Sequence, residues 1–324
     1  MIKISRKIYL LGVLAILFKV FIASFIYINL FSQKNIEDRV IIIPKSCSIK
    51  CTSGILLEAG IIRHKLFFIS YARSFGLLGK RIVAGEYEIP KGANLVEIFD
   101  KISNGRVVTH QFTIPEGLTN FQIFEILRNQ HGVINDEAEL NKYKEGEFYP
   151  NTYNYLYNTK ISELLNTMNL KMKSIISEEW EKRDVANTEE LSSPFDALIL
   201  ASIVEKEAKL DEEKPYIAAV YLNRLKRKIP LQADPTVIYG ISEKGNFSRK
   251  VTYADLKFDS PYNTYLYAGL PPTLICNPGK SSILAVLHSV QTNDIYFVAD
   301  GSGKHIFASS YKQHLQNIEK IRSK

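Results

Sequence analysis

The stretch SPFDALILASIVEKEAKL, residues 193–210, carries the strongest helix signal in the chain. Ser193 is a favoured N-cap residue, and Pro194 suits the first position of a helix. Asp196 then lies near the positive end of the helix dipole. An apolar run follows and leads into a Glu-Lys-Glu triplet. The pattern predicts a helix over residues 193–210 that packs into a core and carries two acids near its end.

The two glutamates of the triplet, Glu205 and Glu207, face different sides of this helix, since two positions rotate by about 200°. Glu207 follows Leu200 by seven residues and Val204 by three, which places its carboxylate on the apolar stripe. Glu205 precedes Lys209 by four residues, the spacing of a solvated ion pair, which predicts a solvated or a supporting position. Desolvation favours a protonated carboxyl, which a general acid requires. Spacing therefore favours Glu207 as an acid, and a glutamate paired with a buried arginine or capped by backbone is the alternative.

Length and composition indicate a globular protein of about two domains: 324 residues, 46% of them hydrophobic and 23% charged. The net charge of +7 raises the question of nucleic acid. The basic residues are scattered, however, without a long basic block or interleaved aromatic residues, so we expect no nucleic-acid partner.

Cysteines and histidines do not form a recognisable ligand set. The three cysteines give neither a disulfide framework nor a four-ligand zinc site. Cys47 and Cys51 are close enough in sequence to bridge in an oxidising compartment, but free thiols are the expectation. The six histidines are dispersed, and we expect no metal and no cofactor.

The N-terminal region predicts a membrane anchor. Residues 1–7 include three basic residues and precede an almost wholly apolar run of 24 residues, 8–31. A helix needs about 20 residues to span a bilayer. Lys19 lies within the run, at a cost of about 2.5 to 3.5 kcal/mol that snorkelling of its side chain reduces. Positive charge ahead of the span places residues 1–7 in the cytoplasm and the rest outside; a cleaved signal peptide is the alternative.

The remaining chain predicts two α+β domains, with a boundary near residue 112. The first, 39–112, has an amphipathic helix whose buried face is Leu95, Ile98, Phe99 and Ile102. Its other expected elements are a strand at 39–44, helices at 51–62 and 63–77, and a strand ahead of Pro90. In the second domain, 113–324, we expect helices at 119–130 and 161–183, an aromatic-rich loop at 145–157 and a hairpin turning at Asp300-Gly301.

Five motifs occur in order across the second domain: LASIVEKEA, AAVYLNRL, PLQADPTVIYG, SPYNTYLYAGLPPTLICNPG and YFVADGSGKHIF. Together they resemble the MltG/YceG family of membrane-anchored endolytic murein transglycosylases over most of residues 113–314. The resemblance implies a transmembrane helix (8–31), a small LysM-like α+β module (39–112) and a mixed α+β catalytic domain (113–324). The family's catalytic glutamate is the second acid of E-K-E, which corresponds to Glu207.

The resemblance also implies a reaction and a location. The family cleaves the MurNAc-β-1,4-GlcNAc bond of nascent peptidoglycan, which gives 1,6-anhydroMurNAc ends and terminates strand elongation. One acid serves the whole reaction, whereas ordinary glycosidases use two carboxylates. The implied partners are glycan strands, the cytoplasmic membrane through residues 8–31 and peptidoglycan synthases. The catalytic domain would lie on the extracytoplasmic side of the cell inner membrane.

Eight further residues are candidates for substrate binding: Glu205, Asn223, Gln232, Asp234, Tyr239, Tyr262, Asn263 and Thr264. Some have an alternative role: Asp234 before proline can open a turn, Asn223 can pair locally, and the tyrosines, together with Tyr265, can be packing residues. His305 and His314 match family positions, and a structural role is favoured for both. Asn151 stands where the family commonly has Asp.

Two other functions compete with the lytic reaction. One is a non-catalytic peptidoglycan-binding scaffold of the wall-synthesis machinery. The other is a hydrolase that uses Glu207 with Asp234 and a water molecule.

Overall fold

The computed structural model describes residues 6–32, 37–136, 142–242 and 249–323, and it has the mixed α+β composition expected from the sequence. The chain divides into two compact units. The first comprises Met1–His110 and Asn154–Asn158, and the second Gln111–Tyr153 and Thr159–Lys324. Most of the predicted cytoplasmic tail, residues 1–7, lies outside the described part of the chain.

The first unit begins with helix α1, Arg6–Phe31. An 18-residue window within its segment Tyr9–Phe31 has a mean hydropathy of 2.4 and no buried residues. By length and composition this helix is able to cross a membrane.

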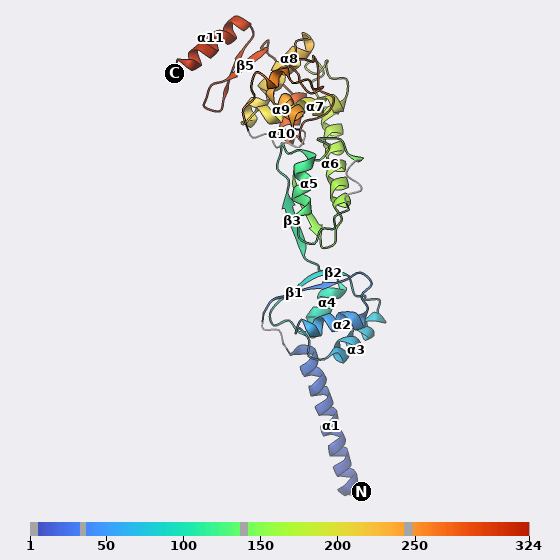
Figure 1. The fold of residues 1–324 in the computed structure, drawn as a ribbon. Helices are drawn as coiled ribbons and strands as arrows, with labels where there is room; N and C mark the ends of the chain where they lie inside the picture. The colour runs from blue at the N-terminus through green and yellow to red at the C-terminus, as the bar shows by residue number, and fades with distance from the viewer. Residues whose placement is uncertain (1–5, 33–36, 137–141, 243–248, 324) are drawn as a thin grey trace. The chain divides into compact units, whose positions relative to one another are not determined.

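A small two-stranded sheet and three helices form most of the rest of the first unit (Figure 1). The antiparallel strands are β1, Arg39–Ile43, and β2, Gly85–Ile89, and between them the chain forms helices α2, Ile49–Glu58, and α3, Lys65–Gly76. Helix α4, Leu95–Ser103, completes the core.

The predicted face of α4 is confirmed, because Leu95, Ile98, Phe99 and Ile102 are all buried. The N-terminus of α4 is closed by the reciprocal capping box of Asn94 with the third helical residue. Each side chain of the box satisfies a backbone N–H that the helix itself leaves without a partner.

Cys47 and Cys51 form a disulfide, so the expectation of free thiols is wrong for this pair. The cap residue Ser48 starts α2 between them and brings their Cα atoms to 5.5 Å, within the range that a disulfide requires. Cys276 is a free, buried thiol.

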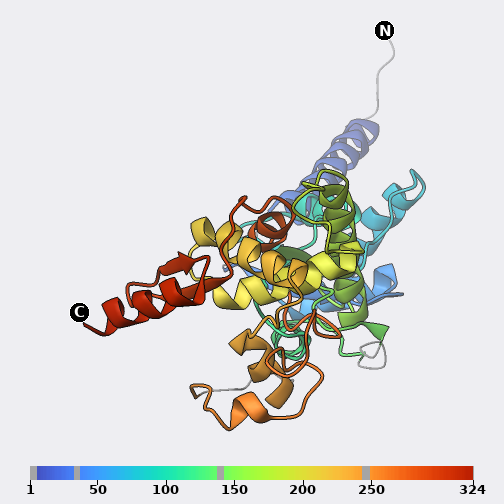
Figure 2. The ribbon, with the colours of Figure 1, turned by 90° about the horizontal axis from the view of Figure 1, so that it is seen from above.

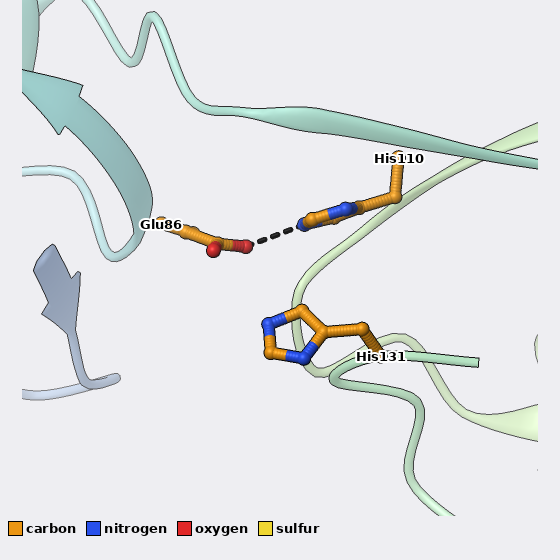
Figure 3. A group of neighbouring side chains, drawn as sticks. All are labelled: Glu86, His110 and His131. Atoms are coloured by element: carbon orange, nitrogen blue, oxygen red, sulfur yellow. Dashed lines mark hydrogen bonds and ion pairs between the residues drawn. The ribbon is translucent and has the colours of Figure 1, made fainter. Parts of the chain in front are cut away.

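Strands β3, Thr109–Thr113, and β4, Thr152–Leu156, form a second two-stranded sheet. The sequence predicted a loop over 145–157, and β4 corrects it: burial alternates along the strand with the period of two that places Tyr153 and Tyr155 on one face. Within the first unit, His110 of β3 binds the carboxylate of Glu86 on β2 at 2.5 Å (Figure 3).

Helices dominate the second unit, and α7, α8 and α10 pack against one another at its core (Figure 2). A hairpin of β5 and β6 follows, and α11 lies against both of its strands. The bounds are α5, Asn120–Arg128; α6, Ile161–Glu181; α7, Pro194–Glu207; α8, Lys214–Lys226; α9, Asp234–Ile241; α10, Lys280–Leu287; β5, Tyr296–Ala299; β6, His305–Ala308; and α11, Tyr311–Arg322.

The hairpin prediction is confirmed. Ala299 pairs with His305 at the end of the ladder, and Asp300 accepts the N–H of Ser302 at 2.8 Å within the turn. Gly301 has a φ of 87°, a conformation that glycine adopts without strain.

Helix α7 differs from its prediction in two ways. Its side chains from Ala197 to Val204 are all buried, so the helix is enclosed on every side instead of along one stripe. It also ends at Glu207, three residues before Leu210, because Ala208 is extended (φ −85°, ψ 127°). Glu207 is therefore the last helical residue.

Candidate active site

The carboxyl group of Glu207 lies at the C-terminus of α7, beside polar groups of α8 and α9. The hydroxyl of Tyr221 on α8 donates a hydrogen bond to its Oε1 at 2.8 Å, and Tyr221 itself is 1% exposed. A helix C-terminus carries partial negative charge, so the position of Glu207 disfavours an ionised carboxylate.

The pKa of Glu207 is raised to about 7. Burial is the largest cause, because it desolvates the charged form. The hydrogen bond from Tyr221 opposes this shift, the negative charge of Asp234 adds to it, and the positive charge of Arg224 opposes it. Near neutral pH the group is thus able both to donate and to accept a proton.

Asp234 and Tyr265 form a second polar group beside Glu207. The hydroxyl of Tyr265 donates to Asp234 Oδ1 at 2.6 Å, and burial together with this carboxylate raises the pKa of Tyr265. Asp234 is the first residue of α9, where the helix dipole stabilises a negative charge. The alternative prediction, in which Asp234 opens a turn, is therefore corrected: Asp234 begins a helix.

Arg224 supplies a buried positive charge near both groups. It is 8% exposed, and its guanidinium donates to the carbonyls of Ile295 at 2.7 Å and Leu231 at 2.6 Å. These carbonyls hold the guanidinium in place, and burial lowers its pKa. Sequence reasoning missed both Arg224 and Tyr221. The signal was present in AAVYLNRL, where a tyrosine and an arginine three residues apart interrupt an apolar helix.

Of the two positions predicted for Glu205, solvated or supporting, the structure has the supporting one. Its side chain is 9% exposed and accepts from the backbone N–H of Gly279 at 2.9 Å and from Ser282 Oγ at 2.6 Å. Lys214 Nζ lies 3.4 Å from it. The carboxylate therefore caps the N-terminus of α10, and its hydrogen bonds are with protein groups.

Asn263 and Thr264 are buried supports of the site. Asn263 is 0% exposed, donates to the carbonyls of Leu256 and Phe258, and accepts the N–H of Tyr265 at 3.0 Å. This last bond fixes the residue that contacts Asp234.

Thr264 holds the segment ahead of α9. Its carbonyl accepts the N–H of Gln232 at 3.0 Å, and its hydroxyl accepts the N–H of Ala233 at 3.0 Å. Gln232 has a φ of 51° and is exposed, as is Asp234, while Ala233 between them is buried. Of the predicted substrate-binding residues, Gln232 and Asp234 are the two exposed ones on this segment.

The other candidates point elsewhere. Asn223 donates to the carbonyls of Thr292 and Asp294 at 2.8 and 2.9 Å, and it lines a cavity of about 550 Å³ whose lining does not include Glu207. On α8, Asn223 is two residues from Tyr221, which turns the two side chains about 200° apart.

Tyr239 and Tyr262 form an edge-to-face pair with centroids 4.8 Å apart. Tyr239 also donates to Glu145 Oε2 at 3.3 Å, at a cavity of about 370 Å³. Burial raises the pKa of Glu145 to about 7. Sequence reasoning missed this second acid with a raised pKa, which lies in the segment it treated as a loop.

The two histidines have contacts within the protein. His305 Nδ1 lies 2.9 Å from Glu213 Oε2, and its backbone N–H donates to the same carboxylate. His314 stacks on Tyr296 at 5.1 Å. The carbonyl of Asn151 accepts the N–H of Ile114, a contact that the change from Asp leaves intact.

Comparisons with known proteins agree on one family. The model of the YceG-like family matches residues 41–320. A protein of Bacillus subtilis (strain 168) named endolytic murein transglycosylase is 30% identical over 314 residues, which cover 87% of this chain and 84% of that protein. A protein of the same name from Streptococcus pneumoniae serotype 2 (strain D39 / NCTC 7466) is 33% identical over 184 residues, 56% of this chain and a third (33%) of that longer protein.

A solved structure is also similar. The crystal structure of a yceG-like protein from Listeria monocytogenes, at 2.6 Å, has a TM-score of 0.57 and 29% identity, and the match covers 86% of this chain and 98% of that one. The match to the family model spans far more than half of the chain. This chain therefore belongs to the YceG-like family.

Proposed function

We propose that this protein is a membrane-anchored endolytic murein transglycosylase that cleaves the MurNAc-β-1,4-GlcNAc bond within nascent peptidoglycan and so terminates strand elongation. Its relatives carry that name at 30 and 33% identity. The observation that supports the chemistry is the Glu207 carboxyl group, which has a pKa of about 7 and is oriented by Tyr221.

In the proposed reaction Glu207 first donates a proton as a general acid and then accepts a proton as a general base. Its protonated carboxyl gives a proton to the glycosidic oxygen as the bond from that oxygen to C1 of MurNAc breaks, and the sugar gains positive charge at C1. The Glu207 carboxylate then takes the proton of the C6 hydroxyl while O6 bonds to C1. The products are a 1,6-anhydroMurNAc end and a free GlcNAc hydroxyl, no water is consumed, and Glu207 is protonated again.

The neighbours of Glu207 support both halves of this cycle. Tyr221 stabilises the carboxylate form, so it favours the release of the first proton. Asp234 is an exposed carboxylate near Glu207, and it would stabilise the positive charge at C1. We propose Gln232 as a neighbouring sugar contact, because its side chain is exposed on the same segment.

The anchor and the N-terminal module complete the proposal. Helix α1 would span the cytoplasmic membrane with residues 1–7 in the cytoplasm, and the remaining chain would lie outside. The order β1–α2–α3–β2 supports a LysM-like module over residues 39–112, followed by the catalytic domain over 113–324. Peptidoglycan synthases are the proposed protein partners.

The test is the digestion of purified murein by Glu207→Gln. We expect the variant to release no anhydromuramoyl products while it keeps the melting profile of a folded protein. The matched control is Glu212→Gln, which removes an exposed carboxylate that pairs with Lys304 and should leave activity unchanged. Full activity of Glu207→Gln would refute the assignment.

Mass spectrometry of the products separates the competing functions. Products heavier by one water molecule would identify a hydrolase, in which Asp234 would activate the water. Binding of murein by the unmodified protein without any released product would identify a scaffold.

A further inference from the structure

We propose that helix α3 and the turn after it form a second membrane contact, an interfacial surface that rests on the anionic bilayer beside α1. We define this contact surface by Leu66, Ser70, Ser74, Leu77 and Leu78. The inference rests on the proposed anchoring through α1, because only an inserted α1 brings the surface to a bilayer.

The contact surface is a continuous face of α3. Leu66, Ser70, Ser74 and Leu77 follow one another at intervals of four, four and three residues, the spacing of one helix face. The opposite face holds Phe68, which is fully buried in the core of the first unit. The three leucines of the surface are strongly exposed: Leu66 by 74%, Leu77 by 90% and Leu78 by 77%.

The surface is continuous with the end of the membrane helix. Ile26 and Leu30 of α1 line an apolar cavity of about 440 Å³ together with Leu66, Phe67, Ser70, Tyr71 and Ser74 of α3. The rings of Phe25 and Phe67 also meet edge to face, with centroids 5.5 Å apart. Residues 25–30 form the C-terminal end of the span, which is where α1 leaves the hydrocarbon region. Any side chain beside them therefore lies at the depth of the bilayer interface.

Charge favours a lipid bilayer over a protein partner as the occupant of this surface. Residues 63–81 contain five basic residues and no acidic residue. Arg63, Lys65, Arg73 and Arg81 are exposed, and Lys80 pairs with Asp100 at 3.2 Å. Exposed leucines flanked by arginine and lysine are typical of helices that lie in a membrane interface, where the apolar groups enter the acyl boundary and the cations meet anionic headgroups.

The cavity between α1 and α3 has a role in this arrangement. It is mainly apolar and opens toward the side chains of the membrane helix, so acyl chains of the adjacent leaflet would fill it. Filling it with lipid removes the rings of Phe67 and Tyr71 from water, which is favourable for apolar surface.

The cysteines of this protein allow a specific labelling experiment. Cys47 and Cys51 are joined, and Cys276 is buried with its thiol pKa raised by burial, so an introduced cysteine is the reactive one. Three variants of the full-length protein would carry the environment-sensitive dye NBD: Leu77→Cys on the surface, Val20→Cys within α1, and Val40→Cys, a 60% exposed residue of β1. Each is reconstituted in phosphatidylglycerol vesicles with or without a quencher on the acyl chains.

We expect quenching at Leu77→Cys close to that at Val20→Cys and several-fold greater than at Val40→Cys. In vesicles of phosphatidylcholine alone, quenching at Leu77→Cys should fall. The added substitutions Arg73→Gln and Arg81→Gln should abolish this difference between the two lipids.

Two results would overturn the inference, and they differ from each other. In the first, the dye at Val20→Cys is quenched, but the dye at Leu77→Cys is quenched no more than the dye at Val40→Cys. This result would show an inserted anchor without an interfacial contact, and the surface would then be left to a protein partner. A lack of quenching at Val20→Cys would refute the anchor itself. Murein digestion by the same unlabelled variants reports separately on the proposed catalytic function.

Discussion

At the scale of single residues, the candidate site depends on which neighbours of Glu207 stabilise its protonated carboxyl group and which stabilise its carboxylate. Burial of Glu207 and the charge of Asp234 favour the protonated form, while Tyr221 and Arg224 favour the carboxylate. The two sets bring the pKa of Glu207 to about 7. A lytic mechanism requires both forms within one turnover. Removing a neighbour from either set should therefore shift the pKa of Glu207 in a known direction.

Tyr221→Phe removes the hydrogen bond that stabilises the Glu207 carboxylate. We expect the pKa of Glu207 to rise, so the alkaline limb of the pH–rate profile should move to higher pH. The maximal rate should fall about tenfold, since the carboxyl loses the bond that orients it. The control is Tyr153→Phe, which removes another buried tyrosine hydroxyl, bonded to the carbonyl of Tyr149, without a contact to Glu207.

Asp234→Asn should move the same limb in the opposite direction. The substitution removes a negative charge that raises the pKa of Glu207, so this pKa should fall. The alkaline limb could instead shift in the same direction in both variants, or stay in place in both. Either result would show that a group other than Glu207 governs this limb.

The stability of the protein should also report the raised pKa of Glu207. The folded pKa of about 7 exceeds the ordinary value of 4.5, so the folded state holds this proton more tightly than the unfolded state. Stability is therefore lost as the pH rises from 4.5 through 7, by about 3 kcal/mol for this group. Relative to the native protein, Glu207→Gln should melt at higher temperature near pH 8 and at a similar temperature near pH 4. Equal differences at both pH values would contradict this.

At the scale of elements, Glu205 joins two helices that the chain separates widely. Glu205 lies near the C-terminus of α7, yet its carboxylate accepts hydrogen bonds from Gly279 and Ser282 at the N-terminus of α10. It also lies beside the ammonium group of Lys214, whose side chain is 4% exposed. A buried ion pair that also caps a helix fixes the packing of α7, α8 and α10, and so the position of Glu207.

Glu205→Ala should therefore lower the free energy of unfolding by about 3 kcal/mol, because it leaves Lys214 buried with one carboxylate fewer. Thermal or urea denaturation measures the loss. The matched control is Glu189→Ala, which removes one partner of an exposed pair with Lys226 and should change stability by less than about 1 kcal/mol. Equal effects of the two substitutions would argue against the structural role of Glu205.

At the scale of the whole molecule, the two compact units have separate hydrophobic cores. One core surrounds Phe68 and the α4 face in the first unit, and the other surrounds Leu200 on α7 in the second. Neither core includes residues of the other, so a cavity in one removes packing contacts from that unit alone.

Phe68→Ala should destabilise the first unit by about 3 to 5 kcal/mol. In hydrogen exchange, amides of residues 41–102 should exchange faster, while those of α7 and α10 keep their protection. Leu200→Ala should have the reverse pattern. Faster exchange of both units in either variant would show that they unfold together.

The sequence by itself determined the elements whose signals are local. The long apolar helix α1, the buried face of α4, the cap of α7 and the hairpin at Asp300-Gly301 all follow from residue periodicity, capping and turn chemistry, which act over a few neighbouring positions. The same local reasoning favoured Glu207 over Glu205 as the acid, which stays a prediction. The family motifs then supplied the reaction.

Only the tertiary structure decided which groups meet. Tyr221 and Asp234 reach Glu207 from α8 and α9, and the true role of Glu205 depends on α10, more than seventy residues away along the chain. The spacing of Glu205 from Lys209 describes one helix alone and favours a solvated ion pair. In the structure, other elements enclose α7, and its side chains from Ala197 to Val204 are all buried. Burial, and with it the pKa of a carboxyl group, depends on all the elements that surround it, and a local pattern contains only one of them.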